Sequence, residues 1–230
     1  MKIMKVGLGC AAALCFAASA NAAFIIDIDT DGADDGPITY NANFAFGGDT
    51  TTASTSAKST AVGHNQADSI FGGDGSASPD TYLGLYTPAL DGDNVNLAGQ
   101  ALNTEGDIGG ALAAGASGEY RVYATWPNTS NVSGGLTTFR LNDGVGDLFN
   151  VQLDQNTVQD EELDGAGHEW IFLGTATLDA NTAYTLYQEA GTNSFVSMRA
   201  SAYLFDAVPE PATAGLMGLG SMLMLSRKRR

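Results

Sequence analysis

Apolar residues in the span 23–207 alternate with polar ones over short runs, and no sustained 3.6-residue helical period is present. The clearest alternation extends from Tyr120 to Trp126, where every second side chain is apolar and shares one face of an extended strand. Clusters of Gly, Asn, Asp and Pro, which favour turns, separate these runs. The pattern predicts an all-β domain over residues 23–207, built as a sandwich or a barrel.

Eight runs are expected to be strands. They are Phe24–Asp29, Tyr82–Tyr86, Tyr120–Trp126, Thr137–Leu141, Leu148–Leu153, Trp170–Thr177, Ala183–Glu189 and Phe195–Phe205. Residues 41–80 are rich in Gly, Ser, Thr and Asp and are expected to form an ordered loop or a decorated surface. The glycines of Gly109–Gly115 argue for a loop rather than a helix.

The N-terminus has the three parts of a secretory signal peptide over residues 1–22. Lys2 and Lys5 form the positive region, an Ala-rich apolar run follows, and Ala20 and Ala22 supply the small residues that signal peptidase requires. Both cysteines of the chain fall inside this segment. The mature chain is therefore expected to be exported and to fold without disulfides.

The other end, residues 208–230, also has three parts: a Pro-Glu-Pro element, an apolar stretch and a basic cluster. This order resembles the PEP-CTERM sorting signal of Gram-negative bacteria, carried here by Pro209, Glu210, Pro211, Arg227, Lys228, Arg229 and Arg230. The resemblance implies that an exosortase processes the protein, which then resides in the cell envelope or outside the cell. The apolar stretch Ala212–Leu225 is shorter than the roughly 20 residues of a membrane span, so we expect a short hydrophobic helix that inserts transiently.

Charge excludes one class of partner. The whole chain has a net charge of −16, and the span 23–210 keeps four basic residues against all 26 acidic ones, a net charge of −22. A body this acidic repels phosphate backbones, so we expect no nucleic-acid binding. Cation binding remains compatible with the composition.

Three segments of the second half resemble the signature strands of golvesin C-terminal-like domains. They are Gly118–Trp126, Val151–Gln155 and Trp170–Leu178, and a closing run, Val196–Val208, occupies the position of that family's final strand. The chain departs from the family's usual Ala-Asp-Ala in this run, where it has Arg199-Ala200-Ser201. The resemblance implies a jelly-roll sandwich similar to galactose-binding modules, with a tendency to bind carbohydrate and without catalysis.

The acidic segment after the first expected strand is a candidate calcium site. Asp27, Asp29 and Asp31 precede Gly32 with the spacing of the first half of a calcium loop. An EF-hand requires Glu at the twelfth position, where Ile38 stands, so only a structural calcium site of another type remains. The alternative is an acidic, solvated junction between a strand and a loop.

Candidates for catalysis are few. The cluster Asp160–Asp164 offers paired carboxylates for sugar hydrolysis, although consecutive acids in a turn are more often a solvated charge run. A zinc site would need both His64 and His168, which are far apart in the sequence. No Gly-x-Ser-x-Gly element is present. We therefore expect a protein that is not an enzyme.

Aromatic side chains are the candidate ligand contacts, because sugar rings stack their C–H faces on them. Trp126 and Trp170 are expected to point into the core. Tyr123 and Tyr187 fall on the opposite strand faces and are the exposed candidates. The sequence thus predicts an exported, non-catalytic surface or matrix protein that contacts exopolysaccharide; a secreted glycan-active enzyme or an accessory carbohydrate-binding module is the alternative.

Overall fold

The computed structural model describes residues 23–208 apart from 33–37, 48–50, 55–57, 66, 73–80, 98–99, 101, 103–114, 128–134, 157–169 and 191–197. Its strands are β1 (Ala23–Asp27), β2 (Phe44–Gly47), β3 (Thr51–Ser54), β4 (Ser69–Gly72), β5 (Thr81–Tyr86), β6 (Gly118–Thr125), β7 (Leu136–Asn142), β8 (Asp147–Asp154), β9 (Ile171–Leu178), β10 (Tyr184–Ala190), β11 (Met198–Ala200) and β12 (Ala202–Ala207). One helical turn, α1 (Pro88–Asp91), follows β5 and starts with a proline at its first helical position.

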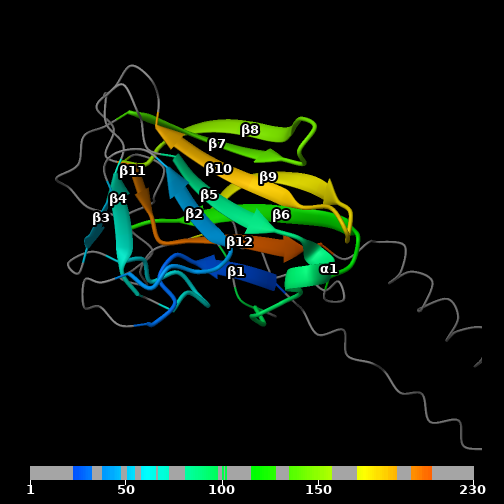
Figure 1. Ribbon diagram of the computed structural model, residues 1–230, viewed down its shortest axis with the longest axis horizontal. Helices are drawn as coiled ribbons and strands as arrows, with labels where there is room; N and C mark the ends of the chain where they lie inside the picture. The colour runs from blue at the N-terminus through cyan, green and yellow to red at the C-terminus, as the bar shows by residue number, and fades with distance from the viewer. Residues whose placement is uncertain are drawn as a thin grey trace, which may run out of the picture.

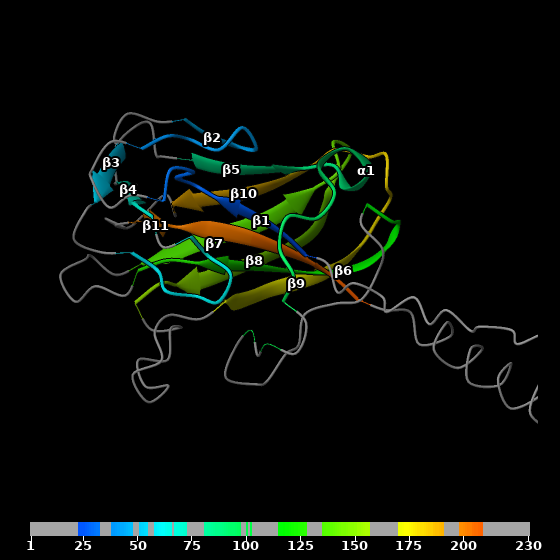
Figure 2. The ribbon, with the colours of Figure 1, turned by 90° about the horizontal axis from the view of Figure 1, so that it is seen from below.

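The strands form a β-sandwich. One layer is a four-stranded sheet with the order β1-β12-β6-β9, and the other is a five-stranded sheet with the order β2-β5-β10-β7-β8. All pairings between neighbouring strands are antiparallel. A small sheet of β11, β4 and β3 lies at one end of the sandwich, and α1 lies at the other end (Figures 1 and 2).

The main core fills the space between the two large sheets. It takes alternate residues from each strand, as the two-residue period predicts: Tyr120, Val122 and Ala124 from β6, and Phe139 and Leu141 from β7. Trp126 continues the β6 series and is completely buried. The predicted inward orientation of this face is confirmed.

Part of the outer face of the four-stranded sheet is buried as well, whereas Phe172 on β9 is 44% exposed. A second core on this face contains Ile25, Tyr123, Leu204 and Trp170. It is covered by apolar residues from two segments that cross the sheet, one near residues 61–62 and the other near residues 95–102. These covering residues are Ala61, Val62, Val95, Leu97 and Leu102. Burial on both faces explains why β1 and β12 have nearly continuous apolar sequences instead of alternating ones.

The outer edge of β1 is closed by a side chain. Asn94 accepts a hydrogen bond from the Ile25 amide at 2.8 Å and donates one to the Ile25 carbonyl at 2.7 Å. An isolated bridge between Ala23 and Val95 continues this pairing. Asn94 thus satisfies backbone groups that an open edge would present to other chains.

The all-β prediction is confirmed, with local differences. The expected run Phe195–Phe205 is divided at Ser201, because its first part leaves the large sheet and pairs with β4 as β11. Residues 41–80, expected to be loop or surface, contain β2, β3 and β4. These strands have four residues each, too few to produce a clear alternation among polar neighbours.

Several predictions concern residues outside the described ranges. These are the signal peptide 1–22 with Ala20 and Ala22, the cluster Asp160–Asp164, His168, and the sorting tail from Pro209 onward with its hydrophobic segment. Within the described ranges, none of the helical structure has the length and apolarity that crossing a bilayer requires.

Candidate functional site

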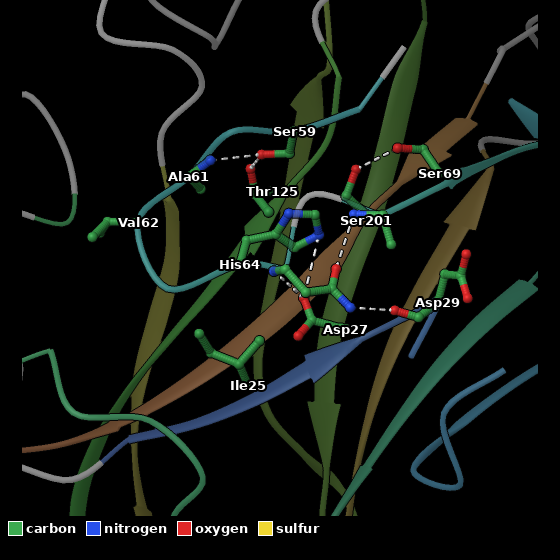
Figure 3. A network of polar contacts seen from close by, with 12 residues as sticks. Ile25, Asp27, Asp29, Ser59, Ala61, Val62, His64, Ser69, Thr125 and Ser201 are labelled. Carbon is green, nitrogen blue, oxygen red and sulfur yellow. Dashed lines mark hydrogen bonds and ion pairs between the residues drawn. The ribbon is translucent and has the colours of Figure 1, made fainter. Parts of the chain in front are cut away.

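Of the three aspartates predicted to bind calcium, Asp29 and Asp31 both accept hydrogen bonds from Thr39, Asp31 through the Thr39 hydroxyl at 3.3 Å, whereas Asp27 has other partners. The Oδ1 atom of Asp27 lies 3.3 Å from Nε2 of His64 and accepts a hydrogen bond from the Asn65 amide. Asp29 turns its carboxylate in another direction (Figure 3). Its Oδ1 atom accepts hydrogen bonds from the backbone amides of Thr39, at 3.0 Å, and Asp31, at 3.3 Å. Asp29 therefore stabilises the turn that follows β1.

This geometry gives little support to a calcium site. Across the described residues, no group of three or more His, Cys, Asp or Glu side chains is placed to hold a metal ion. The Oδ2 atom of Asp29 is buried without a hydrogen-bond partner, which is the one feature that a cation would explain. One such oxygen is far from the six to eight ligands that calcium takes. The calcium site remains a prediction from the sequence alone.

The contact between Asp27 and His64 joins β1 to the segment 58–65. The His64 side chain is 1% exposed and that of Asp27 is 19% exposed. Burial raises the pKa of Asp27 to about 6; the Asn65 amide opposes this rise, and the charge of Asp29 adds to it. The segment is also held by Trp170, whose indole Nε1 donates to the Val62 carbonyl at 2.8 Å.

Two pairs of buried hydroxyls complete the network around His64. The Ser59 and Thr125 hydroxyls are 2.5 Å apart, and those of Ser69 and Ser201 are 2.7 Å apart (Figure 3). Each of the four side chains is 1% exposed or less. Because the hydroxyls bond to one another away from solvent, we assign them to packing rather than to substrate chemistry: Ser59 to that of the segment 58–65 and Ser69 to that of β4.

The prediction that Tyr123 is exposed is wrong. Tyr123 lies opposite the core face of its strand, but it is completely buried. Residues from the two crossing segments cover it, and its ring makes an edge contact with Phe172 at 5.5 Å. Tyr123 is therefore unavailable for contact with a ligand in solution.

Tyr187 lies on the outer face of the five-stranded sheet and is partly exposed. Its direct cross-strand neighbours are Leu83 on β5 and Arg140 on β7. Arg140 in turn pairs with Asn150 on β8, so a row of four side chains crosses four adjacent strands. We call this row, together with Glu189 on β10, the outer-face row.

Arg140 is fixed at the centre of the outer-face row. Its guanidinium lies 3.6 Å from the centroid of the Tyr187 ring, a cation–π contact. Its Nε and Nη2 atoms donate to the two carboxylate oxygens of Glu189 at 3.0 and 3.1 Å, and Nη1 donates to Asp147 at 3.3 Å. Hydrogen bonds from Asn142 and Arg140 lower the pKa of Asp147, so this carboxylate is ionised at neutral pH. Sequence reasoning missed Arg140, since its partner Glu189 is 49 residues away.

Arg199 is a second arginine whose role the sequence does not reveal, and it is buried. Arg199 is 1% exposed and donates to the Pro127 carbonyl at 3.0 Å and to Asn156 at 2.6 Å. Its backbone carbonyl accepts from the side-chain amides of Gln155 and Gln188. Burial lowers the pKa of Arg199 to about 10. Arg199 is therefore a buried structural arginine.

Comparison with known proteins identifies the tail. The PEP-CTERM protein-sorting motif matches residues 207–230, which indicates export and processing by an exosortase. No curated protein matches the chain. Among solved structures, the chain is similar to a Paenibacillus xanthan lyase, with a TM-score of 0.49 and 17% identity over 82% of this chain. The match covers 13% of the lyase chain, and a likeness this distant carries no argument about activity. The golvesin-like resemblance is not confirmed.

Proposed function

We propose that this protein is an exported, non-catalytic component of the cell surface or extracellular matrix, and that its outer-face row contacts exopolysaccharide. The sorting motif supports the destination. The observation that carries the contact is the arrangement of Tyr187, Arg140 and Glu189 on an open sheet face.

This arrangement has the chemistry that sugars require. An aromatic ring accepts the C–H face of a pyranose, while guanidinium and carboxylate groups exchange hydrogen bonds with its hydroxyls. Two carboxylates and the Tyr187 ring already orient Arg140, so little side-chain entropy is lost on binding. Further polar groups flank the row, with Gln152 donating to the Thr138 hydroxyl at 3.1 Å.

Charge favours an uncharged glycan. The outer-face row has one cation, Arg140, which Glu189 and Asp147 already neutralise. The span 23–210 has a net charge of −22, so a polyanionic glycan would be repelled at low ionic strength. A neutral polysaccharide meets no such barrier.

The carboxylates of this face give no support to glycoside hydrolysis. That reaction pairs an ionised carboxylate with an acid whose pKa is raised. Glu189 and Asp147 both contact Arg140, and the pKa of Asp147 is lowered. Among the described aspartates, burial raises the pKa of Asp27, which contacts His64, and of Asp93, which follows α1, and neither of them belongs to the outer-face row.

Glycan-array binding by the exported protein, without and with calcium, tests the proposal. We expect binding to neutral glycans, reduced roughly tenfold or more by Tyr187→Ala or Arg140→Ala, which corresponds to about 1.4 kcal/mol. Phe172→Ala is the matched control, because this exposed aromatic lies on β9 of the other sheet. Unchanged binding by both outer-face variants, or cleavage of a bound glycan, would contradict the proposal.

A further inference from the structure

Two aromatic side chains at the edge of the sandwich are unusually open to solvent. Tyr40 is 41% exposed and Phe46, on the edge strand β2, is 44% exposed. Their ring centroids are 5.2 Å apart, with an angle of 42° between the rings. We call these two residues the aromatic pair.

The aromatic pair is anchored to the core through Phe44. The Phe44 ring lies 5.9 Å from Tyr40 and 6.4 Å from Phe46, and it is itself 6% exposed. Phe44 in turn contacts the buried rings of Tyr82 at 6.1 Å and Tyr203 at 6.4 Å. The exposed rings are thus the outer end of a continuous series of ring contacts.

Backbone pairing also holds Tyr40 in place. Tyr40 forms an isolated antiparallel bridge with Asp29. On either side of it, the Thr30 amide donates to the Thr39 carbonyl at 2.9 Å and the Asn41 amide donates to the Ile28 carbonyl at 3.1 Å. A ligand that stacks on the aromatic pair therefore meets rings that are already oriented, which lowers the entropic cost of binding.

Polar groups suited to sugar hydroxyls accompany the rings. Burial and the charge of Asp29 raise the pKa of Tyr40, so its hydroxyl remains a hydrogen-bond donor at neutral and mildly alkaline pH. The segment paired with Tyr40 also has the exposed residues Thr30 and Asp31, which supply hydroxyl and carboxylate oxygens.

From these observations, we propose that the aromatic pair is a second binding subsite, which stacks on a ring of a neutral polysaccharide. It is separate from the outer-face row. Ala45 pairs with Leu83 of that row, and Phe46, the next residue along β2, points to the other face of the sheet. Two subsites on different faces allow one molecule to contact two polysaccharide chains.

The exposed area of the aromatic pair and the charge around it favour a neutral sugar ring over a protein partner or a membrane surface. Aromatic residues offer about 150–250 Å² each, so two that are less than half exposed present roughly 150–200 Å². A stable protein partner buries about 800 Å² on each side, whereas one sugar ring matches the smaller area. The nearby Asp29 and Asp31 disfavour an anionic surface such as a phospholipid headgroup layer.

Affinity electrophoresis of the exported protein tests the inference. Native gels contain dextran, galactomannan, xylan or hydroxyethyl cellulose, and the retardation of the band gives a dissociation constant for each. We expect Tyr40→Ala and Phe46→Ala each to weaken binding to at least one of these polymers by fivefold or more. Phe172→Ala is the control, since Phe172 has the same 44% exposure as Phe46.

The outcomes separate the two subsites. Loss of retardation in the Tyr40 and Phe46 variants, with the Tyr187→Ala protein still retarded, supports the aromatic pair even if the outer-face row binds nothing. Affinities within twofold of the unsubstituted protein in both variants overturn it, as does the absence of retardation in all four gels. Circular dichroism establishes that the variants are folded.

Discussion

Replacing Asp27 by Asn is expected to stabilise the protein at neutral pH, although it removes one member of a contact between Asp27 and His64. Asn keeps an oxygen that accepts hydrogen bonds from the Asn65 amide and from His64. It removes a carboxylate that is mostly buried and lies near the charge of Asp29. The gain is the free energy that the folded protein spends to ionise this group.

The magnitude follows from the pKa. The pKa of Asp27 rises from 3.8 to about 6 on folding, and each unit corresponds to about 1.36 kcal/mol, which gives about 3 kcal/mol as an upper limit. Between these two values the folded state holds the proton more tightly than the unfolded state. The contribution of Asp27 to the free energy of unfolding therefore falls as the pH rises from about 4 to about 6.

Urea unfolding at several pH values between 3.5 and 7.5 measures this effect. The difference in unfolding free energy, variant minus parent, should be small near pH 3.5 and should increase to roughly 2–3 kcal/mol by pH 7. His64→Gln in both backgrounds removes the imidazole that contacts Asp27 and separates the contribution of His64 from that of Asp27. A difference that is independent of pH, or a variant that is less stable than the parent at pH 7, would refute the reasoning.

Four other predictions concern packing, metal binding and processing. Trp170→Ala should cost about 3–5 kcal/mol in urea unfolding, because it removes a completely buried ring and its hydrogen bond to Val62; a loss of a few tenths would mean that the ring is not in the core. Gly84→Ala should cost roughly 1–3 kcal/mol, because its Cβ would lie 2.8 Å from the Tyr203 ring, whereas Gly146→Ala, with open space around it, should be nearly neutral; equal effects would contradict this packing. If Asp27, Asp29 and Asp31 bind calcium, calcium should raise the melting temperature more than sodium does at matched ionic strength; equal shifts would contradict the calcium prediction. N-terminal sequencing of the exported protein should start near Ala23, and an intact Met1 would contradict the signal-peptide prediction.

Local sequence was sufficient for most of the fold. Alternating apolar positions predict strands at Tyr120–Trp126 and Thr137–Leu141, which correspond to β6 and β7. The four-residue strands β2, β3 and β4 were not recognisable, because so short a run has no period to detect. Their formation depends on partners distant in the sequence, such as the pairing of β4 with β11.

The candidate sites were harder to predict, since they depend on which surfaces become covered. Alternation places Tyr123 opposite the core, but it cannot reveal that two remote segments bury that second face. The same segments bring His64 to Asp27, 37 positions earlier in the chain. Tyr187, predicted to be exposed, is partly exposed, and its contact with Arg140 depends on strand register, which the sequence does not reveal.

The measurement that tests the central claim most directly is the affinity of the exported protein for exopolysaccharide purified from the producing bacterium. Titration calorimetry with the parent, Arg140→Ala and Phe172→Ala proteins is sufficient. The account predicts binding by the parent, a roughly tenfold weaker interaction for Arg140→Ala because the outer-face row loses its central donor, and parental affinity for Phe172→Ala. Absence of binding by the parent, or equal affinities for all three proteins, would contradict it.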